Sequence, residues 1–120
     1  AYERLIIFVE RMHPNSMISR FYSKDTTAQD LHLAMVQSIR AEFEHNLSQQ
    51  LYVSAPVWMM IVQVKEEIIS IVNRVASDLA ESATGKDLSR AIIEYFINNE
   101  QVMPTQKALD SLKTEVKKIF

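Results

Sequence analysis

The chain has 120 residues but only one glycine, Gly85, and three prolines, Pro14, Pro56 and Pro104. Glycine and proline are the residues that most often form turns and end secondary structure elements. A β-rich domain needs turn residues about every 8–12 positions, far more often than they occur here. The scarcity of both residues therefore predicts an all-α fold in which long helices are joined by a few short connections.

The spacing of the apolar residues divides the chain into five expected helices. Apolar side chains that recur every three or four residues lie on one face of a helix. This pattern predicts helices over residues 2–12, 27–48, 54–80, 88–97 and 105–120. The third has the widest apolar sector, which is typical of the central helix of a bundle. We therefore expect one soluble domain, residues 1–120, built as a helical bundle around a long third helix.

Residues that favour helix starts support this division. Thr27 stands three residues before Asp30, which resembles a capping box, and Ser54 stands just ahead of a proline. Asp87 and Thr105 are the expected N-caps of the last two helices. The first helix has none of the usual capping residues before it, so we expect it to continue a longer helix in the intact protein.

Two of the connections between these helices have local signals. Pro14 disfavours helical backbone in the residue before it, so the first helix should end near residue 13. The connector over residues 15–25 carries apolar side chains that suit one short helical turn. Residues 81–86, which include Gly85, are expected to form a turn.

Composition excludes several function classes. The formal net charge is −2 and no basic run exceeds Lys117-Lys118, so a nucleic-acid-binding surface is not expected. The chain has no cysteine, which excludes disulfides, thiolate metal sites and cysteine nucleophiles. No apolar run reaches the roughly 18 residues that a membrane-spanning helix needs.

A metal site is the only catalytic arrangement that the sequence suggests. Glu-x-x-His occurs twice, at Glu10/His13 and at Glu42/His45, and di-metal carboxylate bundles use this pair on two of their helices. Glu10, however, lies on the polar face of its helix, and His13 precedes a proline at the helix end. We therefore expect no metal, no cofactor and no catalytic residues, and we keep the di-metal bundle as the alternative.

Two polar residues fall within the apolar stripe of the second expected helix. His32 has no second titratable partner in the pattern, so we interpret it as a partly buried, hydrogen-bonded residue. Asn46 lies near the helix end, and we expect its amide to bond to the backbone of the following turn.

Three apolar residues lie on faces that are otherwise polar. Ile7 belongs to the polar side of the first helix, and Met59 and Met60 belong to the polar side of the third. Flexible thioethers on an outer face are typical of adaptable contact surfaces. Ile7, Met59 and Met60 are therefore the candidate contacts with a protein partner or with a second copy of the chain.

Three stretches resemble a known family: AYERL at residues 1–5, EFEHNLSQQLYVS at 42–54 and PTQKAL at 104–109. They are similar to an uncharacterised bacterial family of short, single-span membrane proteins, and the resemblance covers the whole chain. It implies an N-terminal membrane span and a Lys/Arg-rich helix ahead of this domain. Basic residues just after a span would place the domain at the cytoplasmic face of the inner membrane. The resemblance implies no activity.

The leading hypothesis is thus a membrane-tethered cytoplasmic interaction or scaffold domain without catalytic activity. The alternative is the di-metal carboxylate bundle that uses both Glu-x-x-His pairs. A small-molecule sensor domain is a third reading. The protein partner is not identified by the sequence.

Overall fold

The wide apolar sector of residues 57–79 becomes the central element of an all-α fold. The computed structural model describes residues 1–99 and 103–119, and in them it contains six α-helices and one 3₁₀ helix. In chain order these are α1 (Tyr2–Met12), α2 (Pro14–Phe21), α3 (Ala28–His45), the 3₁₀ helix η1 (Leu47–Tyr52), α4 (Ala55–Ser77), α5 (Gly85–Asn98) and α6 (Pro104–Ile119).

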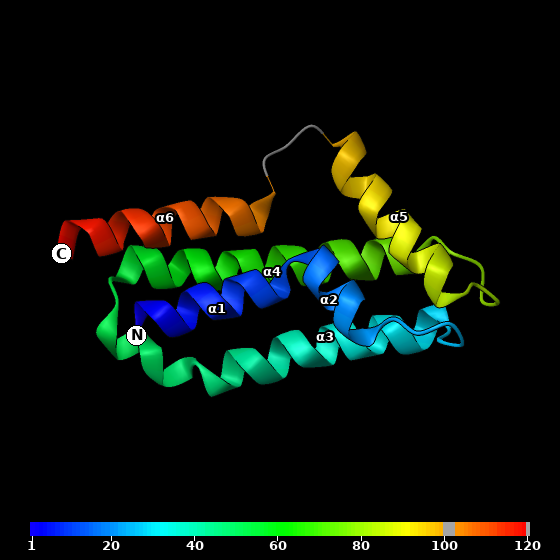
Figure 1. Cartoon of the computed structure of the whole chain (residues 1–120), viewed down its shortest axis with the longest axis horizontal. Helices are drawn as coiled ribbons and strands as arrows, with labels where there is room; N and C mark the ends of the chain where they lie inside the picture. Colours follow the sequence, from blue (N-terminus) through cyan, green and yellow to red (C-terminus); the bar gives the residue numbers. More distant parts are fainter. Residues whose placement is uncertain (100–102, 120) are drawn as a thin grey trace.

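The helix α4 contacts most of the other helices. It runs along the long axis of a molecule that measures 49 × 30 × 19 Å. The helices α1, α3 and α6 lie alongside it, whereas α5 leaves at an angle at the opposite end from the start of α1 (Figure 1). The end of α6 and the start of α1 lie at the same end of the bundle.

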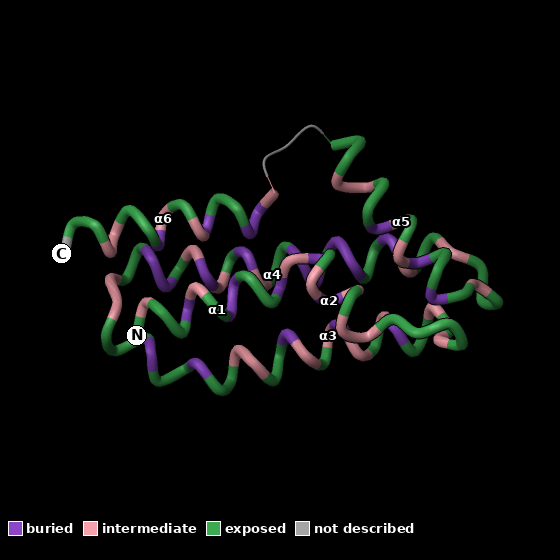
Figure 2. The backbone as a smooth tube through the Cα atoms, in the orientation of Figure 1, coloured by how far each residue is buried: buried purple, intermediate pink, exposed green. Residues whose placement is uncertain are grey.

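The buried residues line the inner faces of these helices (Figure 2). The helix α4 contributes the largest share, and its residues Ile61, Ile68 and Val72 are inaccessible to solvent. Its start is capped by Ser54, whose hydroxyl accepts a hydrogen bond from the backbone N–H of Val57 at 3.3 Å. The predicted central helix is therefore confirmed, together with its cap.

The starts of α3 and α5 are joined to each other. Thr27 and Thr84, the N-caps of the two helices, form an isolated antiparallel bridge, with a hydrogen bond of 2.7 Å from the Gly85 N–H to the Thr26 carbonyl. A Cβ atom at Gly85 would lie 2.7 Å from that same carbonyl oxygen. The only glycine of the chain therefore allows two backbone segments to approach closely.

This pairing corrects the expected start of α5. Thr84, and not Asp87, is the N-cap, and the Asp87 carboxylate completes a capping box by accepting from the Thr84 N–H at 3.0 Å. These hydrogen bonds hold the pKa of Asp87 below its usual value. Gly85 is the first residue of the helix and not part of the preceding turn.

The structure contains two helices in addition to the five that the sequence pattern predicted. The connector after residue 13 is the helix α2, which begins at Pro14 and buries Met17. The end of the second expected helix, predicted to reach residue 48, instead closes at His45 and passes into η1. The expectation of five helices was therefore too low.

Thr105, the expected N-cap of the last helix, does not precede that helix. It lies inside the first turn of α6 and is fully buried. Proline at the start of a helix has no N–H to satisfy, so Pro104 can begin α6 while Thr105 turns inward. Thr105 is thus a core residue.

Three aromatic rings join α1, α3 and α4 near the end of α3. The ring of Phe43 lies 6.2 Å from that of Phe8 and is stacked at 5.5 Å on that of Trp58. The ammonium of Lys65 lies 4.1 Å from the centre of the Phe43 ring. This stack sets the position of α1 against the end of α3, where a pocket opens.

Candidate functional site

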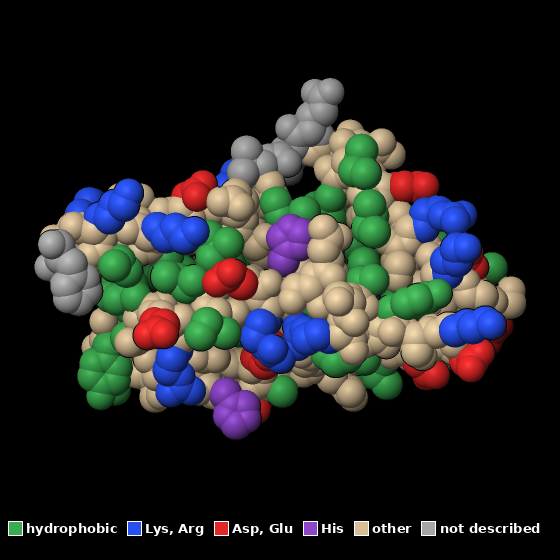
Figure 3. All heavy atoms as spheres, in the orientation of Figure 1, with side chains coloured by type: hydrophobic (Ala, Val, Ile, Leu, Met, Phe, Trp, Pro, Cys, Tyr) green, Lys and Arg blue, Asp and Glu red, His purple; other side chains and the backbone are tan. Residues whose placement is uncertain are grey.

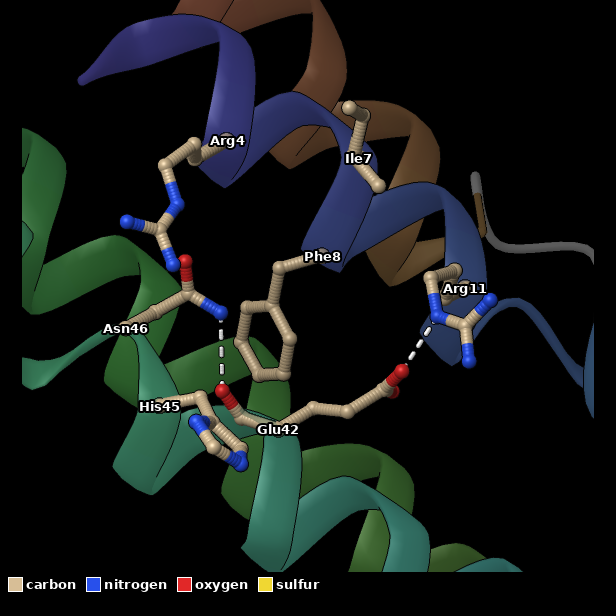
Figure 4. A pocket seen from close by; sticks show the side chains of 7 residues that line it. All are labelled: Arg4, Ile7, Phe8, Arg11, Glu42, His45 and Asn46. Atoms are coloured by element: carbon tan, nitrogen blue, oxygen red, sulfur yellow. Dashed lines mark hydrogen bonds and ion pairs between the residues drawn. The ribbon is translucent and has the colours of Figure 1, made fainter.

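The pocket lies between α1 and the C-terminal end of α3, and its volume is about 310 Å³. It has an apolar floor and charged walls (Figure 4). The residues that line it are Arg4, Ile7, Phe8, Arg11, Glu42, His45 and Asn46. It brings together one of the candidate contact residues, Ile7, and the second Glu-x-x-His pair.

The carboxylate of Glu42 is the centre of the charged wall. It pairs with the guanidinium of Arg11 and lies 3.8 Å from a terminal nitrogen of Arg20. Arg20 also donates a hydrogen bond to the Arg11 carbonyl at 2.6 Å, so its guanidinium provides a donor for one carbonyl in the last turn of α1. Burial and the neighbouring Arg11 lower the pKa of Arg20. Glu42 therefore links α1, α2 and α3 at the rim of the pocket.

Asn46 is the most buried polar residue of the pocket, with 9% of its surface exposed. Its amide nitrogen donates to the Glu42 carbonyl at 2.8 Å, which corrects the expected bond to the following turn. Its amide oxygen is buried and accepts no hydrogen bond from the described part of the chain. In Figure 4 this oxygen points toward the side of the pocket on which Arg4 lies.

Two basic side chains of the pocket have no polar partner among the described residues. Within residues 1–99 and 103–119, neither Arg4 nor His45 forms an ion pair or a side-chain hydrogen bond, and both are exposed. By contrast, Arg11 is paired with Glu42. The pocket therefore has more positive groups than its single carboxylate neutralises.

The four residues of the alternative, a di-metal site, do not all come together. Glu10 is exposed and does not line the pocket, while His13 caps α2 by accepting the Asn15 N–H on its Nδ1 at 3.1 Å. Across residues 1–99 and 103–119, no group of three His, Asp or Glu side chains is placed to hold a metal ion. Glu42 and His45 share the pocket, but Glu42 is engaged with two arginines.

His32 is partly buried and hydrogen-bonded, as expected from its place in the apolar stripe. Its Nε2 lies 2.6 Å from the amide oxygen of Asn73 on α4. Because an amide oxygen only accepts, the imidazole N–H is the donor. This bond ties α3 to α4 and leaves His32 with a structural role.

The candidate contacts Ile7, Met59 and Met60 occupy different surroundings. Ile7 is 50% exposed at the edge of the pocket, and Met59 is 68% exposed on α4. Met60 is half-buried and lines a separate groove between α4 and α6. They do not line one common groove, and their contact with a partner stays a prediction.

Several strongly exposed apolar residues were missed by the sequence pattern. Leu51 and Tyr52 of η1 are 83% and 67% exposed, and Leu47 of the same helix is also exposed. They stand between two periodic segments, so no helical face could be assigned to them. The only available signal was a Leu-Tyr pair in a segment that was expected to be a loop.

Comparison with known proteins identifies the family. A model described as "Family of unknown function (DUF7935)" matches residues 1–119. The chain belongs to this family. No match to the DUF7935 chain was found among curated proteins or among solved structures.

The family match confirms the coarser part of the resemblance, namely an uncharacterised family that covers the chain. The bacterial source and the membrane span of the DUF7935 chain stay predictions. None of the helices in the described ranges, 1–99 and 103–119, is long and apolar enough to cross a membrane.

Proposed function

We propose that this DUF7935 chain is a non-catalytic interaction domain that binds a protein partner at the cytoplasmic face of the inner membrane. The observation that carries the proposal is the exposure of large apolar side chains at the start of α4 and in η1. Met59, Leu51 and Tyr52 each expose about two-thirds or more of their surface, at 68%, 83% and 67%.

These side chains belong to one stretch of the molecule. The helix η1 ends at Tyr52 and α4 begins at Ala55, so Met59 lies about 6 Å along the axis from the start of α4. Single exposed apolar residues are common, but a run of them beside one helix start is typical of contact surfaces. A protein partner that covers them would remove this apolar area from water.

One face of the molecule has a surface of mixed character. On the face shown in Figure 3, hydrophobic side chains are interspersed among Lys, Arg, Asp and Glu along the length of the molecule. Interfaces of non-obligate complexes are about as apolar as the rest of a protein surface. The distribution therefore suits a reversible complex better than a permanent one. The membrane location is supported only by the resemblance of the three sequence stretches.

Site-specific photo-crosslinking in cells that make the full-length protein tests the proposal. A photoreactive amino acid replaces Met59 or Ile7, and a matched variant carries it at Leu33, an exposed apolar residue of α3. We expect a crosslinked protein of defined mass from positions 59 and 7, and little from position 33. The crosslinked species should sediment with the membrane fraction.

Two outcomes would contradict the proposal. Equal labelling from all three positions would show that the exposed apolar residues make no specific contact. Recovery of the full-length protein in the supernatant after membrane sedimentation would contradict the proposed location at the membrane.

A further inference from the structure

The pocket between α1 and α3 combines an excess of positive charge with an apolar floor. The Glu42 carboxylate pairs with the guanidinium of Arg11 and lies 3.8 Å from that of Arg20, while Arg4 lines another side of the same pocket. Arg4 is the one that no carboxylate of the described ranges neutralises. Since the whole chain has a net charge of −2, this local excess of positive charge runs against its overall balance.

The apolar floor lies between the two arginines of α1. Residues three and four positions apart share a helix face, so Ile7 lies on the same face as Arg4 and Arg11. Phe8 closes the bottom of the pocket and is almost fully buried. A ligand that fits this arrangement has a carboxylate next to an apolar side chain.

The buried oxygen of Asn46 adds a third requirement for a ligand, namely a hydrogen-bond donor. An acceptor that is removed from water and left without a donor costs free energy until a donor reaches it. The Asn46 oxygen points toward the side of the pocket where Arg4 lies (Figure 4). A backbone N–H from a ligand, or Arg4 itself when a bound carboxylate draws it inward, would supply that donor.

We propose that this pocket binds an acidic peptide segment in which a carboxylate lies beside branched apolar side chains. The inference rests on the proposed function, because it takes the ligand to be part of a protein partner. The carboxylate pairs with Arg4, the apolar side chain covers Ile7, and a backbone N–H or the reoriented Arg4 satisfies Asn46. A phosphate group fits less well, since the floor is apolar and the Glu42 carboxylate repels a doubly charged anion.

The probe for this site is the peptide acetyl-Leu-Asp-Leu-amide, added to isotope-labelled protein and followed by NMR. We expect shift changes that saturate at the amides of residues 4–11 and 42–46. Two control peptides separate the contributions, namely acetyl-Leu-Asn-Leu-amide, which lacks the charge, and acetyl-Ala-Asp-Ala-amide, which lacks the apolar groups. Each control is expected to bind roughly five- to tenfold more weakly.

Two variants are expected to change the affinity for the probe in opposite directions. Arg4→Gln removes the unpaired guanidinium and should weaken binding of the probe roughly fivefold. Glu42→Gln removes the internal carboxylate that competes for Arg11, so it should strengthen binding. Arg90→Gln on α5 is the matched control, because Arg90 is an exposed arginine that does not line this pocket. A merely structural role for Glu42 would not produce tighter binding.

The inference is overturned if the neutral Asn peptide binds as well as the Asp peptide, or if Glu42→Gln weakens binding. Absence of shifts at residues 4–11 and 42–46 up to the solubility limit of the peptide would also overturn it. Such a failure leaves the crosslinks from position 59 unaffected. Loss of those crosslinks with retained peptide binding would instead contradict only the proposed interface.

Discussion

Gly85 is held where its backbone meets another segment of the chain. An added Cβ would lie 2.7 Å from the Thr26 carbonyl oxygen, and this oxygen also accepts the Gly85 N–H. Because a backbone atom cannot yield as the end of a flexible side chain does, the bridge between the starts of α3 and α5 would have to shift.

We expect Gly85→Ala to lower the free energy of unfolding by about 1–3 kcal/mol. The gain in helix propensity from alanine offsets only part of this strain. Urea denaturation followed by circular dichroism measures the loss, with Ser82→Ala in the exposed turn before α5 as the control. An unchanged midpoint for Gly85→Ala would show that the two segments are not in close contact.

Thr105 is a buried residue whose hydroxyl has no hydrogen-bond partner among the described residues. A buried hydroxyl without a partner destabilises the folded state, and valine has nearly the same shape without this group. We expect Thr105→Val to raise the free energy of unfolding by about 1 kcal/mol.

Chemical denaturation tests this expectation against Thr114→Val. The Thr114 hydroxyl donates to the Asp110 carbonyl at 2.8 Å on an exposed face of α6, so its loss should have little effect. A decrease in stability for Thr105→Val would mean that the Thr105 hydroxyl is bonded in solution.

At the scale of the element, α2 begins with an unusual cap. The neutral Nδ1 of His13 accepts the N–H of Asn15 at 3.1 Å, and burial lowers the pKa of His13 below its usual value. Protonation of this nitrogen removes the acceptor. The folded state therefore binds the proton more weakly than the unfolded state does.

Stability should accordingly depend on pH near the pKa of histidine. The contribution of His13 is present in full above its unfolded pKa of about 6.5 and is lost as the pH falls from there through the folded pKa. Asparagine also caps helices but does not titrate, so His13→Asn should flatten the decrease in unfolding free energy between about pH 7 and pH 5.5. The difference between the two proteins isolates His13, because His32 and His45 are present in both. Parallel pH profiles would contradict this role.

For the whole molecule, the exposed apolar residues lead to a prediction about self-association. Ile7, Met59 and Met60 are the predicted contacts, and a second copy of the chain is one partner that could cover them. We expect light scattering to detect a dimer whose mass falls when Ile7→Gln and Met59→Lys are combined.

Met60 is half-buried against α6, so Met60→Gln can also disturb packing. The mass of this variant must therefore be read together with a measurement of its folded fraction. Leu33→Gln is the control for loss of an exposed apolar residue on a different helix. A wild-type protein that is monomeric at high concentration would refute homo-oligomerisation. A dimer that survives these changes would have its interface elsewhere.

Helix bounds could be predicted wherever a periodic apolar face and a local end signal coincide. The first helix, Tyr2–Met12, and the start of α4 behind Ser54 follow from nearest-neighbour effects, namely the restriction before Pro14 and the cap on Val57. The apolar period and the capping interactions each involve residues within one or two helical turns, so both can be recognised in a short stretch of sequence.

Contacts between distant segments decided the rest. Both Thr84 and Asp87 are good capping residues, and the bridge to Thr27 selects Thr84. The pocket depends on Phe8 packing against Phe43, which places Arg4 opposite Asn46. Sequence alone determined the helical class, the central helix and the exposure of Ile7 and Met59, because each depends on local periodicity. Only the tertiary structure brought the basic residues of α1 to the end of α3, since the apolar stripe of a helix does not specify which other helix packs against it.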